Sequence, residues 1–202
     1  MQALVLIDIQ NDFIPGGALE VPEGNLIIPL INDHIHAFDL VVATQDWHPR
    51  DHMSFASNHQ GRAPFEEINW HGMPQTLWPD HCVQGTLGAA FPDELDQNPI
   101  STIIRKGMDR DIDSYSGFYD NGHKVNTGLA GYLREKGVKE LYFCGLAADI
   151  CVYYSILDAL NTGFTVTLFL DATRPLNKET FKNQQKELKL KQVRLDLMAD
   201  FD

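Results

Sequence analysis

The sequence predicts an α/β fold, a three-layer, doubly wound domain with a mainly parallel sheet and helices on both faces. Two observations predict it. Apolar runs of strand length, such as 3–7 and 40–44, lack the alternation of a half-exposed strand, which favours strands buried on both faces. Segments with helical spacing lie between several of these runs, and strands that alternate with helices form parallel βαβ units.

The individual elements follow from the same patterns. In the helix at 23–38 the apolar residues recur at helical spacing, and Pro29 is tolerated near its first turns. Thr127 can cap a helix that Gly137 ends, and Gly163 ends the helix after it. In chain order the expected elements are a strand at 3–7, a helix at 23–38, strands at 40–44 and 101–105, a helix at 127–134, a strand at 140–144, a helix at 152–160, a strand at 164–170, a helix at 177–190 and a weak strand at 192–198.

Residues 47–99 break this regular pattern. The segment is rich in His, Pro, Gly, Trp and Asn and shows no sustained periodicity. Long irregular segments inside compact domains are usually functional, so we expect a loop insertion that carries part of a site. No repeat or linker divides the chain, and residues 1–202 are expected to form one domain.

The composition excludes some classes of protein. A net charge of −12 argues against binding to nucleic acid or to anionic membranes, because both need clustered cationic side chains. Three cysteines without a CxxC pair give no disulfide framework. There is neither a leader-like N-terminus nor an apolar run of about 20 residues, so the sequence predicts a soluble, cytoplasmic protein.

Cys151 closes a turn between a strand and a helix, at 145–151. A thiol in the first turn of a helix feels the positive end of the helix dipole and unpaired backbone N–H groups, which favour the thiolate. For a single free cysteine the alternative is an ordinary buried core residue, and Cys144 is interpreted in that way.

Four reactive side chains stand at or just after the ends of predicted strands: Asp8, Asp46, Lys106 and Cys151. Ligands bind outside the carboxyl ends of parallel strands, so these groups are expected at one edge of the sheet. There a carboxylate can accept the thiol proton and return it to a leaving group, while an ammonium group stabilises both anions.

A second set of residues suggests a metal site. Asp46, His48 and His52 lie close together in the sequence, and a segment farther along supplies His81. Carboxylate and imidazole ligands suit zinc, iron or manganese, although loop histidines without a metal are the alternative. Aromatic residues in the same loops could bind a flat ring or simply pack the loops; they are Phe13, Trp47, Trp70, Trp78, Tyr115 and Phe118.

Together these residues resemble the nicotinamidases (pyrazinamidases) of the isochorismatase-like cysteine hydrolase superfamily, over about 3–173. The resemblance rests on an ordered set of blocks. They are Ile7-Asp8-Ile9-Gln10-Asn11-Asp12-Phe13, Gln45-Asp46-Trp47-His48-Pro49 with His52, Trp78-Pro79-Asp80-His81-Cys82, Arg105-Lys106-Gly107, Asp113-Ser114-Tyr115-Ser116 and Gly145-Leu146-Ala147-Ala148-Asp149-Ile150-Cys151.

The resemblance implies roles for these residues. It implies a catalytic triad, a metal site in which His52 is the least regular ligand, and a cis peptide bond at 146–147 beside an oxyanion hole. It also implies a ring sandwiched by two aromatic side chains, with Tyr115 as a further substrate-binding candidate. The residues are Asp8, Lys106 and Cys151 for the triad; Asp46, His48, His81 and His52 for the metal; Ala147 and Cys151 for the oxyanion hole; and Phe13 and Trp78 for the ring.

The implied reaction is the hydrolysis of nicotinamide to nicotinate and ammonia through a cysteine thioester, in NAD salvage, with pyrazinamide as a second substrate. One divalent cation, zinc before iron or manganese, would position the ring, and a homo-oligomer is possible. Alternatives are a related amidase for another small amide, an ether hydrolase that does not need Cys151, and a catalytically silent metal-binding module.

Overall fold

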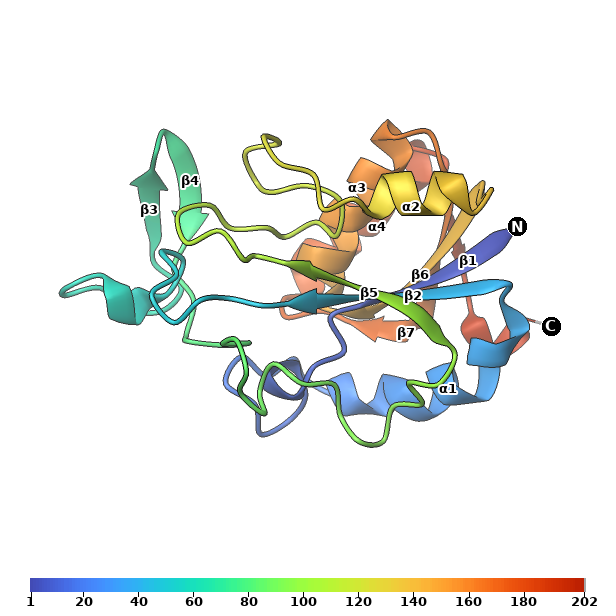
Figure 1. Ribbon diagram of the computed structural model, residues 1–202, viewed down its shortest axis with the longest axis horizontal. Helices are drawn as coiled ribbons and strands as arrows, with labels where there is room; N and C mark the ends of the chain where they lie inside the picture. Colours follow the sequence, from blue (N-terminus) through green and yellow to red (C-terminus); the bar gives the residue numbers. More distant parts are fainter. Residues whose placement is uncertain (202) are drawn as a thin grey trace.

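A computed structural model describes residues 1–201 and contains a six-stranded sheet in the order β5-β2-β1-β6-β7-β8 (Figure 1). Every neighbouring pair in this sheet is parallel. The strands and α-helices are β1 (Gln2–Ile7), α1 (Ile27–His34), β2 (Leu40–Asp46), β3 (Glu67–Trp70), β4 (Met73–Thr76), β5 (Ile100–Lys106), α2 (Leu129–Glu135), β6 (Glu140–Leu146), α3 (Tyr153–Asn161), β7 (Thr165–Arg174), α4 (Lys178–Leu190) and β8 (Arg194–Asp196).

Helices cover both faces of the sheet, which makes three layers. Helix α1 lies on one face, and α2, α3 and α4 lie on the other (Figure 1). Strand β1 shows why both layers are needed, because Leu4 and Leu6 belong to the core cluster that contains α1, whereas Val5 and Ile7 belong to the cluster that contains α2, α3 and α4. All four side chains are at most 1% exposed, so the continuous apolar run is buried on both faces, and the predicted fold class is confirmed.

The strand register brings the reactive positions to one edge. Asp46 is paired with Lys106 across β2 and β5, and Ile7 is paired with Gly145 across β1 and β6. Gly145 adopts a φ of 115°, and a Cβ atom there would collide with the backbone of Ile7. A glycine is therefore required where the chain leaves β6 close beside the end of β1.

The segment 47–99 is not wholly irregular. It contains an antiparallel hairpin, β3–β4, which the sequence did not reveal because each strand is only 4 residues long. Isolated bridges from His48 to Val83 and from Phe55 to Trp78 hold the two ends of the segment together. These bridges bring His81 back towards His48 over a long sequence separation.

Two helices differ from the sequence-based expectation. The helix expected at 23–38 is α-helical only as α1, with 3₁₀ turns at 24–26 and 35–37. Pro29 lies in the first turn of α1, where its missing N–H needs no partner. Cys151 lies in a π-helical turn, Ala148–Val152, that precedes α3, rather than in an ordinary first turn. Among residues 1–201, no helix has the length and hydropathy to cross a membrane.

Candidate active site

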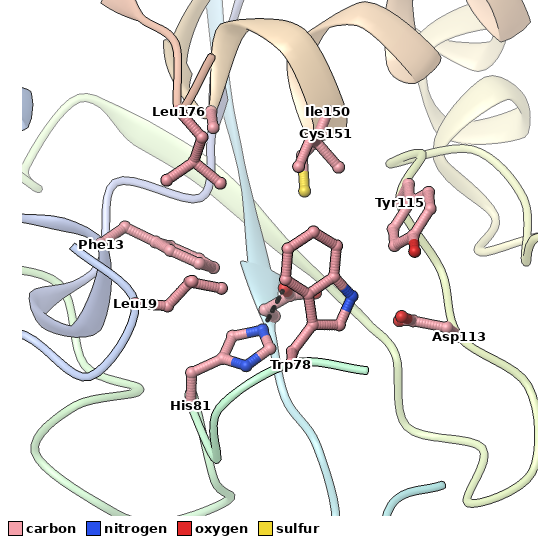
Figure 2. Close-up of a pocket in the computed structure, with 11 residues that line it drawn as sticks. Phe13, Leu19, Trp78, His81, Asp113, Tyr115, Ile150, Cys151 and Leu176 are labelled. Carbon is pink, nitrogen blue, oxygen red and sulfur yellow. Dashed lines mark ion pairs between the residues drawn. The ribbon is translucent and has the colours of Figure 1, made fainter. Parts of the chain in front are cut away.

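A pocket opens at the carboxyl edge of the sheet, and the sulfur of Cys151 points into it (Figure 2). Aromatic side chains stand on opposite sides of this space, with Phe13 on one side and Tyr115 on the other, and with Trp78 below the sulfur in the view of Figure 2. The pocket is lined by Phe13, Leu19, Asp46, Trp78, His81, Asp113, Tyr115, Ala147, Ile150, Cys151 and Leu176.

Lys106 is the centre of the charged groups beside this pocket. Its Nζ lies 2.9 Å from Asp8 Oδ2, 2.6 Å from Asp46 Oδ1 and 3.5 Å from Cys151 Sγ, and it also donates to the Ser114 carbonyl at 2.9 Å. Burial alone would lower the pKa of Lys106, but the two carboxylates hold this pKa well above its ordinary value. The ammonium group therefore stays charged between two acids and a thiol.

The two acids that share this ammonium group differ in basicity. Burial raises the pKa of Asp8, and the nearby charge of Asp46 adds to the increase, although Lys106 opposes both. Burial would raise the pKa of Asp46 too, but the charge of Lys106 is the strongest of the influences that oppose burial and hold the pKa of Asp46 well below its ordinary value. Asp46 is therefore the permanent anion, and Asp8 is the better proton acceptor.

Asp8 is held in place from the neighbouring strand. The hydroxyl of Thr44, in β2, donates to Asp8 Oδ1 at 2.6 Å and accepts from the Asp8 backbone N–H at 3.2 Å. Asp8 itself has a φ of 45°, a left-handed conformation that turns the chain as it leaves β1. Thr44 was not singled out in the sequence, where it is one β-branched residue within an apolar strand.

The thiol of Cys151 is not a resting thiolate, which corrects the sequence-based expectation. Burial raises the pKa of Cys151 well above its ordinary value; Lys106 opposes this shift, and the carboxylates of Asp8 and Asp46 add to it. The residue is only 6% exposed, so desolvation disfavours the anion and has the largest influence on this pKa. Cys151 therefore needs a base, and its Sγ and an oxygen of Asp8 lie within 4.8 Å of each other.

The turn that carries Cys151 is fixed at both of its ends. The Leu146–Ala147 peptide bond is cis, as the resemblance implied, and the Ala147 carbonyl accepts from the N–H groups of Ile150 and Val152. Ala147 lines the pocket together with Ile150 and Cys151. The backbone of this turn thus forms the pocket wall next to the nucleophile.

Asp149 ties the same turn to the loop after β7. Its two carboxylate oxygens accept from the N–H groups of Leu176 and Asn177, at 2.8 Å and 2.9 Å. The contact places Leu176 in the pocket wall, next to Ile150. No signal in the sequence marks Leu176 or Leu19 as lining residues, because nothing in their local pattern distinguishes them from other loop leucines.

Asp46, His48 and His81 form a compact, buried group of metal-ligand type. The Nε2 atoms of His48 and His81 lie 3.4 Å and 3.8 Å from Asp46 Oδ2. The Nδ1 atoms face the carbonyls of Gly107 and Pro79, each at 2.8 Å. Since a carbonyl only accepts, both Nδ1 atoms carry a proton, so in the neutral rings both Nε2 atoms present a lone pair, which fits a divalent cation.

His52 lies beside this group but is held differently. Its Nδ1 faces the hydroxyl and the backbone N–H of Ser54, at 2.7 Å and 3.2 Å, and its Nε2 has no hydrogen-bond partner within residues 1–201. Burial lowers the pKa of His52 to about 4, so the ring is neutral at physiological pH. Its nearest companions of ligand type are His48 and Asp113.

The aromatic residues noted in the sequence separate into two groups. Phe13, Trp78 and Tyr115 line the pocket, and Trp78 and Tyr115 meet edge to face with their ring centroids 6.2 Å apart. The others pack elsewhere: Trp47 lies under the guanidinium of Arg105, Trp70 donates to the Asp111 carbonyl, and Phe118 is in the core. Asp113, labelled in Figure 2, also lines the pocket. The sequence analysis names it only within the block Asp113-Ser114-Tyr115-Ser116 and assigns it no role.

Comparisons with known proteins relate this chain to one family. A family model described as the isochorismatase domain matches residues 2–195. A nicotinamidase of Acinetobacter baylyi is 47% identical over 175 residues, which cover 87% of this chain and 82% of that protein.

Solved structures agree in fold as well. A nicotinamidase and pyrazinamidase of Acinetobacter baumanii superposes with a TM-score of 0.96 at 42% identity, covering 100% of this chain and 98% of that chain. A pyrazinamidase of Pyrococcus horikoshii in complex with zinc superposes with a TM-score of 0.80 at 39% identity, covering 97% of this chain and 98% of that chain.

Proposed function

This chain belongs to the isochorismatase family, and we propose that it is a metal-dependent nicotinamidase, an amidohydrolase that converts nicotinamide to nicotinate and ammonia. The same reaction on pyrazinamide is its second activity, as the names of its structural relatives suggest. Nicotinate released in this way returns to NAD, so the reaction belongs to NAD salvage.

One observation carries the proposal. Lys106 Nζ lies within 3.5 Å of both Asp8 and Cys151; all three side chains are buried, and Cys151 lines a pocket with aromatic walls. The arrangement supplies a nucleophile, a base of raised pKa and a fixed positive charge. It suits attack on the carboxamide of a flat heteroaromatic ring.

Acylation begins with the neutral thiol. Asp8 accepts the proton of Cys151 as the sulfur attacks the carboxamide carbon, and the carbonyl oxygen becomes an oxyanion. The backbone N–H groups of Ala147 and Cys151 serve as its donors. As the tetrahedral centre collapses, the C–N bond breaks, and Asp8 gives its proton to the amide nitrogen, which leaves as ammonia.

Deacylation uses the same base. Asp8 takes a proton from a water molecule that attacks the thioester carbon, and the C–S bond breaks. Cys151 leaves as a thiolate and recovers its proton from Asp8, which releases nicotinate and restores the resting enzyme. Lys106 keeps its proton throughout, because the carboxylates around it raise its pKa, and its charge stabilises whichever neighbour is anionic.

The walls of the pocket orient the substrate. Phe13 and Trp78 bind the two faces of the ring, and Tyr115 limits the space beside Trp78. Leu19, Ile150 and Leu176 supply apolar contacts and exclude water from the reacting carbon. These contacts convert the attack of Cys151 into an intramolecular step on a positioned carboxamide.

Asp46, His48 and His81 would hold one divalent cation, and zinc is the metal with which the Pyrococcus horikoshii relative was crystallised. When bound, the cation supplies a coordination position for a ring nitrogen and withdraws electron density from the ring. The fit rests on two buried Nε2 lone pairs and one carboxylate oxygen that face one another.

Ammonia release from nicotinamide tests the proposal. We expect the wild-type protein, loaded with zinc, to release ammonia and nicotinate in equal amounts, and Cys151→Ala to fall to the background rate while it still binds zinc. Cys144→Ala is the matched control, because Cys144 is also buried but lies in the core, on β6. Turnover by Cys151→Ala, or none by the wild type, would contradict the proposal.

A further inference from the structure

His52 is a buried imidazole for which the proposed mechanism has no use. It is 0% exposed, and its ring centroid lies 4.3 Å from that of His48. His52 therefore lies beside the cluster of Asp46, His48 and His81, and its part in cation binding has two possible forms. His52 can be a fourth cation ligand, or it can act on the site from outside the coordination sphere.

The hydrogen bonds of Nδ1 decide which nitrogen of His52 carries the proton. The backbone N–H of Ser54 donates to this Nδ1 at 3.2 Å, and a backbone N–H cannot accept. Nδ1 is therefore the acceptor, and the Ser54 hydroxyl at 2.7 Å donates to it as well. The single proton of the neutral ring is left on Nε2.

His48 and His81 have the opposite arrangement. Backbone carbonyls hold their protons on Nδ1, so their Nε2 lone pairs face Asp46. A nitrogen that carries a proton has no lone pair to give to a cation. Of the three imidazoles in this cluster, two present an acceptor and His52 presents a donor.

The Nε2–H of His52 needs an acceptor, yet none is found within residues 1–201. A buried donor left without a partner costs about 1–3 kcal/mol. Atoms of His52, His48 and Asp113 lie within 4.8 Å of one another. Asp113 accepts from Gln75 Nε2 and from the Ser114 N–H, one bond to each oxygen, so each oxygen keeps a lone pair for a further donor.

We propose that His52 is a positioning residue and not a cation ligand: its Nε2–H donates to a water molecule that also donates to Asp113, beside the cation held by Asp46, His48 and His81. The role rests on the proposed function, since it requires that cation. The water has a donor in His52 and an acceptor in Asp113, the partners that an ordered buried water needs, and it keeps an oxygen lone pair for the cation.

Long-range proton–nitrogen NMR of the imidazole rings tests the proposal directly. In the metal-free protein we expect His52 as the Nε2–H tautomer, and His48 and His81 as the Nδ1–H tautomer. After loading with cadmium-113, the Nε2 of His48 and of His81 should couple to the metal, and His52 should show no coupling. A cadmium coupling to His52, or an Nδ1–H tautomer, would overturn the proposal.

Two variants assign the signals and isolate the contact. His52→Gln removes one ring from the spectrum, which identifies its signals. Ser54→Ala removes the hydroxyl but keeps the backbone N–H that fixes the tautomer. We therefore expect His52 to remain the Nε2–H tautomer in Ser54→Ala, and a switch to Nδ1–H would count against the argument.

Cation affinity, measured by competition with a chelator, provides the second test. His52→Met removes the donor and should weaken zinc binding by roughly 10–100-fold, the range for residues outside the coordination sphere, at an unchanged one zinc per chain. His52→Gln keeps an N–H donor and should recover most of that loss, whereas His81→Ala should lose stoichiometric binding.

Failure of this inference and failure of the proposed function look different. If both His52 variants lose stoichiometric zinc binding, as His81→Ala should, His52 is a ligand and the inference is wrong. Nicotinamide turnover by the wild type would still support the proposed function in that case. A wild-type protein that binds no divalent cation would overturn the cation site of the proposed function and the role of His52 together.

Discussion

The site has two halves, which we call the sheet wall and the loop wall, and they are built by different means. Asp8, Lys106 and Cys151 stand where strands of the parallel sheet end or just beyond them, and strand register brings them together. His48, His52 and His81 come from the segment 47–99 and are oriented by hydrogen bonds to loop backbone and to Ser54.

The walls also differ in how their charges are satisfied. In the sheet wall, Lys106 neutralises the acids around it at 2.6–2.9 Å, so the charges are already paired. In the loop wall, the Nε2 atoms of His48 and His81 lie 3.4 Å and 3.8 Å from a carboxylate oxygen, with lone pairs directed into the cluster. The ion-paired groups of the sheet wall suit proton transfer between fixed positions. The free lone pairs of the loop wall suit a divalent cation that binds after the chain has folded.

Asp46 joins the two walls. Its Oδ1 receives Lys106, and its Oδ2 faces both histidines. The permanent negative charge of Asp46 therefore serves both sides, and it is the charged group through which a change in one wall should be felt in the other. Variants confined to one wall can therefore separate the contribution of the sheet wall from that of the loop wall.

Lys106→Met should have the largest effect, because it removes the charge at the centre of the sheet wall. Two buried carboxylates lose their cation, and breaking a buried ion pair costs about 3–5 kcal/mol. We expect this loss in the unfolding free energy, measured by urea denaturation, together with loss of nicotinamide hydrolysis.

Arg105→Met is the matched control for that substitution. Arg105 precedes Lys106 in β5 but is exposed and lies over the ring of Trp47, 3.8 Å from its centroid. We expect a change in the unfolding free energy of at most about 1 kcal/mol and nearly normal turnover. Equal destabilisation by the two variants would contradict the central role of Lys106.

His48→Ala should act on the loop wall alone and have the next largest effect. The protein should stay folded, lose its zinc, and show a KM for nicotinamide raised roughly tenfold or more, which corresponds to about 1.4 kcal/mol of lost binding free energy. Zinc content and steady-state kinetics measure both changes, and cysteine alkylation reports whether the sheet wall is intact.

His59→Ala is the control for the loop wall. His59 lies in the same segment, and its Nε2 contacts the Met53 carbonyl at 2.7 Å, but it does not line the pocket. We expect normal zinc content and an unchanged KM. Loss of zinc in this variant would mean that any disturbance of the segment 47–99 empties the site.

Asp149→Asn should have the smallest effect and a pH-dependent one. Burial raises the pKa of Asp149 above the ordinary value of 3.8, so the folded protein holds this proton to higher pH than the unfolded chain. The stability that comes from the protonated form is complete below pH 3.8 and is lost as pH rises through the folded-state pKa. The wild type should therefore lose stability relative to the variant across that interval, and the difference should be constant at higher pH.

Urea denaturation of both proteins at a series of pH values measures this difference. The contact with Leu176 and Asn177 links the turn of Cys151 to a loop, so the result also shows how far the sheet wall depends on loop structure. A difference that is independent of pH would contradict the raised pKa of Asp149.

Strand-end residues were the most predictable part of the site. Apolar runs identified the central strands, and the rule for parallel sheets then placed Asp8, Asp46, Lys106 and Cys151 at one edge, where the structure has them. The hairpin β3–β4 was missed because strands of 4 residues are too short to show a periodic pattern. Leu19, Leu176 and Thr44 were missed because their importance lies only in contacts over long sequence separations.

The sequence by itself determined the layers of the fold and the edge of the sheet where the reactive groups meet, because burial patterns are local properties of the chain. Only the tertiary structure decided the state of those groups. Cys151 is a neutral thiol because burial desolvates its anion, and His52 differs from His48 because Ser54, not a carbonyl, faces its Nδ1. Protonation and tautomer depend on which groups surround an atom in space, and the order of residues along the chain does not record this.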